Sequence, residues 1–570
     1  MDNNLFQFFQ FSDRMVQQFA LNASPEALHQ KLDAMADAMG DRAFKKEAAR
    51  QIVERTQPQK AVPDVYADYR PLVRDGIEFF LSRIDRQRLI ELVVDQLKQS
   101  PRTGTEERLL ALAKAFPTLH KLGQIIARHP KIDPAVKQWL IHLENGDYGT
   151  PPHDLLAQIH DELERTGRKS RFDVTPSILS EASVGAVIPF HWRPSRSRAA
   201  IDGVFKILKP GIQSHLDEEL AILEETAGFF EANRDRYPLK DFKFLEVFQD
   251  VREMLTREVD LAAEQSYLAE AAQCYSGMDA ILIPQCFPFG SATITAMAYV
   301  KGPKITDARL DPEQRRRCAA ILFEALVCRP LFSKDEHALF HGDPHAGNLL
   351  AAFDPDAQRP RIGLLDWSLA GRLTKQARIH TVQLIQAVLK EDLSGIRRAV
   401  KALAKCTSMA IPIKRHRFRH QVLQWMRCPE FVRMTLIKRV FRLLELLTYE
   451  GFVFPAELML FRKAIFTLEG VLHDLWPAFD MDAAVVQYMM GLMAQDAPKR
   501  CFNLLFPLAD RPENYTSLIS TMELQSLLVH QYASAVHSSA RTMFGSFMGL
   551  FGLSPWLVPA SVPVTIEKKK

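Results

Sequence analysis

The 570-residue sequence predicts an α+β protein that is predominantly helical and has two lobes. Amphipathic patterns with apolar residues at helical spacing fill the first 110 residues, as in Ile77–Leu81 and Leu89–Val94. Short β-prone runs between residues 180 and 300 bracket a long helical stretch rich in charge. Beyond residue 366 the pattern is helical to about residue 540. This order of blocks favours a small lobe that contains strands, followed by a large helical lobe.

The composition is that of a globular protein, with 47% hydrophobic and 25% charged residues. A net charge of +4 is slight for this length, so the overall charge does not favour nucleic-acid binding. Seven cysteines are scattered without a CxxC pair, which is typical of reduced thiols in a cytosolic compartment. The N-terminus lacks the basic start and apolar run of a signal peptide, and Asp2 argues against a transit peptide. We therefore expect a bacterial cytoplasmic protein.

The most informative motif is His341–Asn348, which reads HGDPHAGN and is followed eighteen residues later by Asp366. The apolar run Ile362–Leu365 predicts a buried strand ahead of Asp366. Two acids and an Asn at these intervals supply hard oxygen ligands for Mg²⁺ and one carboxylate beside a nucleophile. The pattern predicts a phosphotransferase site in which Asp343 is the base-like residue and Asn348 and Asp366 hold metal. A purely structural turn would need no second Asp at a strand end.

A site of this kind requires a lysine on an upstream strand, and Gly203–Leu208 places Lys206 among apolar, β-prone residues. Taken alone, Lys206 could equally be an edge-strand lysine that reaches water. The helical stretch with Glu258, Asp260 and Glu264 offers a partner, since acids at 260 and 264 share one helix face. A solvated acidic face is the alternative for a single glutamate. We predict that Glu264 pairs with Lys206 and that both are catalytic.

These motifs stand in the order found in protein kinases, and the chain resembles the UbiB (AarF) family of atypical protein-kinase-like proteins. Four further segments carry the resemblance. They are Pro117–Gln124 for the family's KxGQ motif, Glu258–Asp260 for its ExD motif, Glu181–Val187 for its alanine-rich loop and Phe454–Pro477 for its C-terminal helical segment. The resemblance runs from about Pro117 to about Asp480, which is most of the chain.

The resemblance implies an atypical kinase-like fold with an N-terminal KxGQ extension and a helical C-terminal segment. It implies binding of ATP with Mg²⁺, and ATPase activity or small-molecule phosphotransfer rather than routine phosphorylation of proteins. The KxGQ residues Lys121 and Gln124 would gate the pocket beside Glu258 and Asp260. The nucleotide would be contacted by the alanine-rich loop, the strand lysine and the last strand of the small lobe, through Ala182, Ser183, Gly185, Val187, Lys206, Met297 and Ala298.

Several positions depart from the family pattern. Glu181 stands where the family usually has Ala, and a carboxylate near phosphates would repel them unless it points elsewhere. Ala186 and Ile188 stand where Gln and His are common. Ser368 replaces the Gly of the kinase metal triplet, which restricts the backbone after Asp366.

The motifs divide the sequence into five parts. These are 1–110, an N-terminal helical region without assigned chemistry; 111–179, the KxGQ extension; 180–300, the kinase-like N-lobe; 301–540, the C-lobe with its helical extension; and 541–570, an apolar tail that associates with a membrane.

Two segments bear on membrane association. Between Asp392 and Glu430 the chain has nine Lys or Arg and no acid, which suits anionic lipid or, equally, a solvated helix face. The stretch Thr542–Ile566 has no charge and could span a bilayer, although its three prolines favour an interfacial hairpin. We predict peripheral association with the inner face of a bacterial cell membrane.

The resemblance also implies a role in isoprenoid quinone (ubiquinone) biosynthesis. The expected partners are an isoprenoid or quinone lipid or its biosynthetic proteins, an anionic membrane surface and a second copy of the chain, with no nucleic acid. Three alternatives stay open: a small-molecule kinase of the aminoglycoside or choline type, a catalytically inert pseudokinase scaffold and a general protein kinase. The KxGQ and ExD segments argue against the first, while Glu181 and Ser368 keep the second open.

Overall fold

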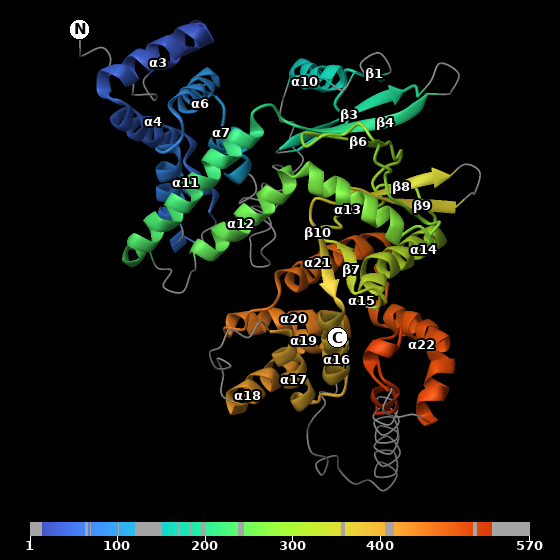
Figure 1. Ribbon diagram of the computed structural model, residues 1–570. Helices are drawn as coiled ribbons and strands as arrows, with labels where there is room; N and C mark the ends of the chain where they lie inside the picture. Colours follow the sequence, from blue (N-terminus) through green and yellow to red (C-terminus); the bar gives the residue numbers. More distant parts are fainter. Residues whose placement is uncertain are drawn as a thin grey trace, which may run out of the picture. The chain divides into compact units, whose positions relative to one another are not determined.

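The computed structural model divides the chain into two compact units (Figure 1). The first unit comprises Met1–Gln273, Ile283–Val300 and Asp366–Leu369, and the second comprises Cys274–Leu282, Lys301–Leu365 and Ala370–Lys570. Within them the structure describes residues 14–62, 67–68, 70–100, 102–119, 151–165, 167, 172–182, 184–194, 200–237, 244–354, 359–404, 415–505 and 510–526. Helices predominate and the strands form small sheets, so the predicted α+β class is confirmed.

The first unit begins with a block of amphipathic helices. They are α2 (Arg14–Asn22), α3 (Pro25–Met39), α4 (Asp41–Thr56), η1 (Pro58–Ala61), α5 (Arg70–Leu81), α6 (Arg86–Lys98) and α7 (Thr105–Lys114). Ser24 and Asp85 cap α3 and α6, because their side chains accept hydrogen bonds from Ala27 N at 3.2 Å and Gln87 N at 2.8 Å. The apolar faces form one core, which α11 (Ile212–Ala232) and the end of α12 (Phe244–Val259) complete.

An antiparallel sheet lies in the same unit, with strand order β1-β3-β4-β6 and β2 beside β3. The strands are β1 (Phe172–Val174), β2 (Ser180–Glu181), β3 (Gly185–Trp192), β4 (Ile201–Leu208) and β6 (Ile294–Ala298). Helix α10 (Pro152–Arg165) covers one face of this sheet (Figure 1). Ala186 and Ile188 are each 1% exposed in the core between helix and sheet. These two positions therefore hold apolar residues because they face this core.

The helical stretch that contains the ExD motif is interrupted. Helix α12 ends at Val259, and α13 (Leu261–Cys274) begins after Asp260. The Asp260 side chain accepts a hydrogen bond from Ala263 N at 2.9 Å, and its carbonyl accepts one from Glu264 N at 3.1 Å. The prediction that Asp260 and Glu264 share the face of one helix is therefore wrong. Asp260 begins a new helix, because a short acidic side chain satisfies backbone N–H groups that no helical carbonyl can reach.

A buried ionic cluster joins the N-terminal helices to α11. Glu219 is fully buried and accepts hydrogen bonds from Arg88 Nη2 at 2.7 Å and from Thr118 Oγ1 at 2.7 Å. Arg88 also contacts Glu218 at 2.6 Å. Burial raises the pKa of Glu219, although the hydrogen bond from Arg88 works in the opposite direction. The cluster anchors Thr118, which lies just ahead of the segment predicted to gate the pocket.

The second unit contains two small sheets and the C-terminal helices. Its strands are β5 (Ile281–Leu282), β7 (His337–His341), β8 (Leu349–Asp354), β9 (Arg359–Leu364) and β10 (Ala370–Thr374). The order β5-β9-β8 makes one sheet, and β10 pairs antiparallel with β7 in the other. Its helices and turns are α14 (Pro312–Phe323), η5 (Glu324–Cys328), α15 (Arg329–Leu331), η6 (Ala346–Asn348), α16 (Lys375–Leu389), α17 (Leu393–Leu403), α18 (Arg415–Met426), α19 (Pro429–Val432), α20 (Leu436–Tyr449), α21 (Ala456–Leu475), α22 (Met481–Leu505) and η8 (Pro512–Asn514).

Strand β9 confirms the strand predicted ahead of Asp366, but the helical pattern predicted beyond Asp366 is wrong at β10. Pairing with β7 decides the conformation there, and Gly371 packs where a Cβ would lie 2.5 Å from Phe340 Cζ. A close approach between two strands is a non-local interaction, so local propensity does not predict it.

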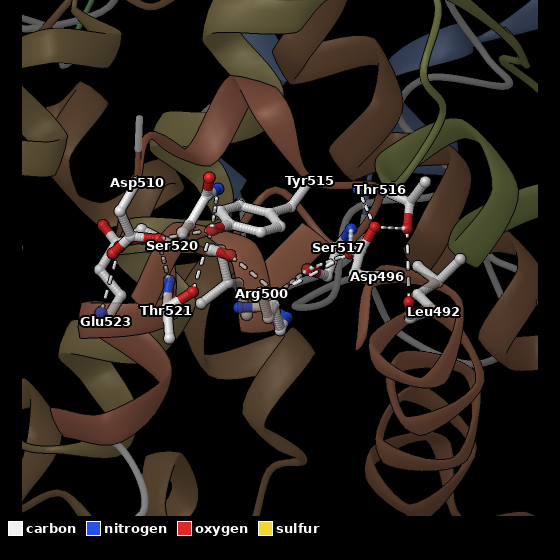
Figure 2. Close-up of polar contacts among 12 residues, drawn as sticks. Leu492, Asp496, Arg500, Asp510, Tyr515, Thr516, Ser517, Ser520, Thr521 and Glu523 are labelled. Atoms are coloured by element: carbon white, nitrogen blue, oxygen red, sulfur yellow. Dashed lines mark hydrogen bonds and ion pairs between the residues drawn. The ribbon is translucent and has the colours of Figure 1, made fainter. Parts of the chain in front are cut away.

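The segment after α22 is held by a polar network (Figure 2). Asp496 is 1% exposed and accepts hydrogen bonds from the backbone N–H and hydroxyl groups of Thr516 and Ser517 at 2.7 to 3.1 Å. Arg500 donates to Ser517 Oγ at 2.7 Å and lies over the Tyr515 ring, 4.2 Å from its centroid. These bonds lower the pKa of Asp496, although burial opposes them.

No helix in the part of the chain that the structure describes is both long and apolar enough to cross a bilayer. The predicted apolar tail, Thr542–Ile566, lies outside the described residues.

Candidate active site

Lys206 occupies the middle of β4, between β3 and β6, with Val187 and Thr295 as its register partners. Its chain neighbours Phe205 and Ile207 are at most 1% exposed and face the core under α10. Because side chains alternate across a strand, Lys206 projects from the other face of the sheet. The position of a lysine within an apolar strand therefore follows from its place in the sheet.

Lys206 lies between two carboxylates of the first unit. Its Nζ is 2.7 Å from Glu264 Oε1, in α13, and 3.2 Å from Asp366 Oδ1. The side chain of Glu264 is 1% exposed, that of Lys206 18% and that of Asp366 41%. Glu264, the most deeply buried of the three, thus contacts the Lys206 ammonium directly. The carboxylate of Asp366 is the more exposed one and is the one that a ligand can reach.

The three groups perturb one another strongly. Burial raises the pKa of Glu264 to about 7, although Lys206 beside it favours the ionised form. Burial opposes the charge on Lys206, but Asp366 and Glu264 outweigh it and raise the pKa of Lys206 above its usual range. Burial also opposes the charge on Asp366, yet Lys206 and hydrogen bonds from Ser368 hold the pKa of Asp366 well below its usual range. Asp366 is therefore an anion at neutral pH.

The backbone at Asp366 is unusual. Its φ of 52° lies in the left-handed region that non-glycine residues rarely adopt. Ser368 stabilises this conformation, because its Oγ and N donate hydrogen bonds to Asp366 Oδ1 at 2.7 and 3.2 Å. The residue that replaces the expected Gly thus contributes a hydroxyl that orients the carboxylate. A strained residue held by its surroundings is common at functional sites.

The alanine-rich loop between β2 and β3 carries its own ion pair. Glu181 Oε1 lies 2.9 Å from Lys209 Nζ, and the two side chains are 7% and 13% exposed. Lys209 N also donates to Val184 O at 3.0 Å. Gly185 is required here, because a Cβ would lie 2.7 Å from Ile207 O. The carboxylate expected to repel phosphates is therefore neutralised by a lysine that the sequence pattern did not single out.

The strand edge predicted to meet adenine is partly engaged by the protein. Ala298 N donates to Gln285 O at 2.9 Å, and Tyr299 N donates to Asp202 O at 3.2 Å. The nucleotide contacts predicted for Met297 and Ala298 would have to use other atoms of this segment.

The predicted catalytic loop lies in the second unit, directly after β7. His341 Nε2 lies 2.8 Å from Leu365 O, and its Nδ1 accepts a hydrogen bond from Asp343 N at 3.2 Å, which assigns the proton to Nε2. Asn348 Nδ2 donates to Asp343 O at 3.1 Å. Leu365 N, one residue before Asp366, donates to Asn348 O at 2.9 Å. The bond to Asp343 O assigns the amide nitrogen of Asn348, so its side-chain oxygen is the acceptor atom.

The other predicted residues contribute less to this geometry. Lys121, Gln124 and Ser183 lie outside the described residues. Glu258 is half-buried and Asp260 is exposed. Their roles stay predictions, as do the catalytic and metal-binding roles of the residues described above.

In the described ranges no three His, Cys, Asp or Glu side chains gather where they could hold a metal ion.

The chain is similar to known atypical kinase-like proteins. Residues 170–400 match the ABC1 atypical kinase-like domain. A protein of Xanthomonas campestris named probable protein kinase UbiB is 24% identical over 385 residues, which cover 65% of this chain and 67% of that protein. The chain thus resembles the UbiB/ABC1 proteins, and residues 170–400 carry the match to their kinase-like domain. The predicted resemblance to this family and the kinase-like fold are confirmed.

Two further similar proteins are longer than the part that they share with this chain. The uncharacterized protein sll1770 of Synechocystis is 25% identical over 68% of this chain and 64% of its own length. Protein ACTIVITY OF BC1 COMPLEX KINASE 3, chloroplastic, of Arabidopsis thaliana is 23% identical over 55% of this chain and 43% of its own length. The chain thus spans less than two thirds of these two relatives. A solved complex of Rv3197 with erythromycin from Mycobacterium tuberculosis matches 66% of this chain and 93% of that one, at 17% identity and a TM-score of 0.39, too low to establish a shared fold.

Proposed function

We propose that this UbiB/ABC1-like protein binds ATP with Mg²⁺ and hydrolyses it or transfers its γ-phosphoryl group. The observation that carries the proposal is Lys206, whose Nζ lies 2.7 Å from Glu264 and 3.2 Å from Asp366. A strand lysine aligned by a buried glutamate is the arrangement that pairs nucleotide phosphates in kinases. Lys206 would pair with the phosphates of a bound nucleotide, and the carboxylate of Asp366 would help to hold its metal ion.

The residues fit a magnesium ion. Mg²⁺ prefers hard oxygen ligands and commonly takes one or two from the protein, with phosphates and water completing its shell. Asp366 offers an ionised carboxylate, and Asn348 offers the oxygen of an amide whose nitrogen donates to Asp343 O at 3.1 Å. When bound, the ion neutralises charge on the transferring phosphoryl group. Asp343 would orient the attacking water or hydroxyl and accept its proton.

The proposed biological role is support of isoprenoid quinone (ubiquinone) synthesis at the inner face of a bacterial membrane. The support is the family resemblance and the sequence, with its basic run between Asp392 and Glu430 and its apolar tail. Isoprenoid or quinone lipids or their biosynthetic proteins, an anionic membrane surface and a second copy of the chain are the proposed partners. Lys121 and Gln124 would keep protein substrates out, so small molecules or water would be the acceptors.

The test compares the whole chain with two variants, Asp366→Asn and the matched control Asp307→Asn, whose side chain is exposed. Mg-ATP at about 100 times its Kd should stabilise the native chain by roughly 2.7 kcal/mol in thermal unfolding. We expect Asp366→Asn to lower phosphate release by on the order of 100-fold or more, with Asp307→Asn unchanged. Equal turnover in Asp366→Asn and the native chain, or no response to Mg-ATP, would contradict the proposal.

A further inference from the structure

A lysine from the C-terminal helical segment lies beside the carboxylate of the catalytic loop. Lys463, in α21, places its Nζ 3.8 Å from Asp343 Oδ1. The side chains are 26% and 11% exposed, so solvent screens the two charges only in part. The loop itself, His341–Asn348, has no Lys or Arg in its sequence. Lys463 therefore places a cation beside Asp343 from a segment distant in sequence, to which no chemistry had been assigned.

One aromatic contact relates this lysine to the loop. Phe461 of α21 is fully buried, and its ring meets that of Phe340 in β7 edge to face, with centroids 5.0 Å apart. Phe461 precedes Lys463 by two residues, and β7 ends at His341, two residues before Asp343. The contact therefore fixes the distance between the stretches of chain that carry the two charges.

Ion pairs hold α21 against α20 on either side of this point. Lys438 Nζ lies 2.6 Å from Glu469 Oε1, and Arg462 Nη1 lies 3.1 Å from Glu445 Oε2. These side chains are between 19% and 32% exposed. The backbone that carries Lys463 is thus held from two directions, which reduces the freedom of its side chain to leave Asp343.

We propose that Lys463 is a positioning residue that holds the carboxylate of Asp343 for phosphoryl transfer, an inference that rests on the proposed function. A separation of 3.8 Å exceeds a hydrogen bond, so Lys463 acts on Asp343 as a charge. In the transfer, an acceptor oxygen bonds to the γ-phosphorus while the bond from phosphorus to the bridging oxygen breaks. The electron pair of that bond leaves with ADP, and the acceptor's proton passes to Asp343. Lys463 keeps its proton throughout.

The expected effect falls on the chemical step. Without Lys463 the carboxylate loses one charge that holds it toward the acceptor, and a misplacement of about 1 Å can cost roughly 100-fold in rate. Binding of Mg-ATP uses Lys206 and the metal ligands instead, so it should be unaffected. A purely structural role for Lys463 would lower stability without separating kcat from KM.

The experiment measures phosphate release, KM for Mg-ATP and the thermal midpoint in the whole chain. The variants are Lys463→Met, Lys463→Arg and the control Lys438→Met, which removes a similarly exposed lysine from the same pair of helices. We expect Lys463→Met to lower kcat by between about 10-fold and 100-fold with KM changed less than about threefold. Lys463→Arg should recover most of the rate, because it restores the charge, and Lys438→Met should leave kcat within about threefold.

Three results would overturn the inference while leaving the proposed function intact. These are a native rate in Lys463→Met, an equal loss in Lys438→Met, and a change confined to KM. If Lys463→Met melts below the assay temperature, Lys463→Gln replaces it with the same criteria. Absence of turnover in the native chain would instead refute the proposed function, and with it this inference.

Discussion

Replacing Lys209 by Met should destabilise the first unit, because it removes the cation that lies 2.9 Å from the buried carboxylate of Glu181. The two side chains are 13% and 7% exposed and their charged atoms are 2.9 Å apart, so the pair is close to fully dehydrated. Removing one partner of a buried pair typically costs about 3 kcal/mol or more in the free energy of unfolding, whereas replacing both with apolar residues is nearly neutral. For a unit of this size, a loss of 3 kcal/mol corresponds to a decrease of roughly 6 °C in Tm.

The assay is thermal unfolding of four proteins: the native chain, Lys209→Met, Glu181→Met and the double variant. Arg316→Met is the control, because its partner pair with Glu313 is 62% and 71% exposed and should contribute less than about 1 kcal/mol. We expect Lys209→Met to unfold well below the control and the double variant to unfold near the native chain. A double variant as unstable as the two single changes combined would refute the reasoning, as would a single change no larger than the control.

The same variants test the nucleotide site. In Lys209→Met the carboxylate of Glu181 loses the neutralising charge of Lys209 beside the loop proposed to cover the phosphates, so Mg-ATP should bind more weakly than in the native chain. The double variant should bind it as the native chain does. Weak binding in both variants would assign the effect to Lys209 itself.

Three further changes have definite expectations. Asp496→Asn should lower the free energy of unfolding by roughly 2 kcal/mol at pH 7. Because folding lowers the pKa of Asp496, the stabilisation from its carboxylate is present above pH 3.8 and is lost as the pH falls below it. The thermal unfolding curves of the native chain and the variant should therefore converge at low pH. Arg88→Met should cost about 3 kcal/mol in chemical unfolding by stranding the fully buried Glu219, and adding Glu219→Gln should recover most of it. Gly185→Ala should lower Tm, because its Cβ would lie 2.7 Å from Ile207 O, and an unchanged melt would contradict that contact.

The strand lysine and the metal-binding acid could be placed from sequence because their signals are local. An apolar run on both sides of Lys206 predicts a strand, and the run before Asp366 does the same. The family motifs then gave the order of the kinase-like segments along the chain. The prediction that Glu264 pairs with Lys206 needed both the local patterns and the family motifs, since the two residues come from separate elements.

The features that sequence did not predict depend on contacts between distant segments. Strand β10 exists because it pairs with β7, and no local preference of Ala370–Thr374 indicates it. The helix break at Asp260 has a local signal, an acid that can cap, which the continuous charge pattern obscured. Lys209 lies beside Glu181 and Lys463 lies beside Asp343, but no sequence pattern around either lysine indicates a functional role.

The central claim is that Lys206 and Asp366 act together on one nucleotide and its metal ion. A crystal structure of the chain with Mg²⁺ and a non-hydrolysable ATP analogue tests it most directly. The account predicts Mg²⁺ about 2.1 Å from an oxygen of Asp366, with Lys206 Nζ moved from Asp366 to a phosphate oxygen. An analogue bound elsewhere, or a metal ion that does not contact Asp366 while Lys206 stays beside it, would contradict it.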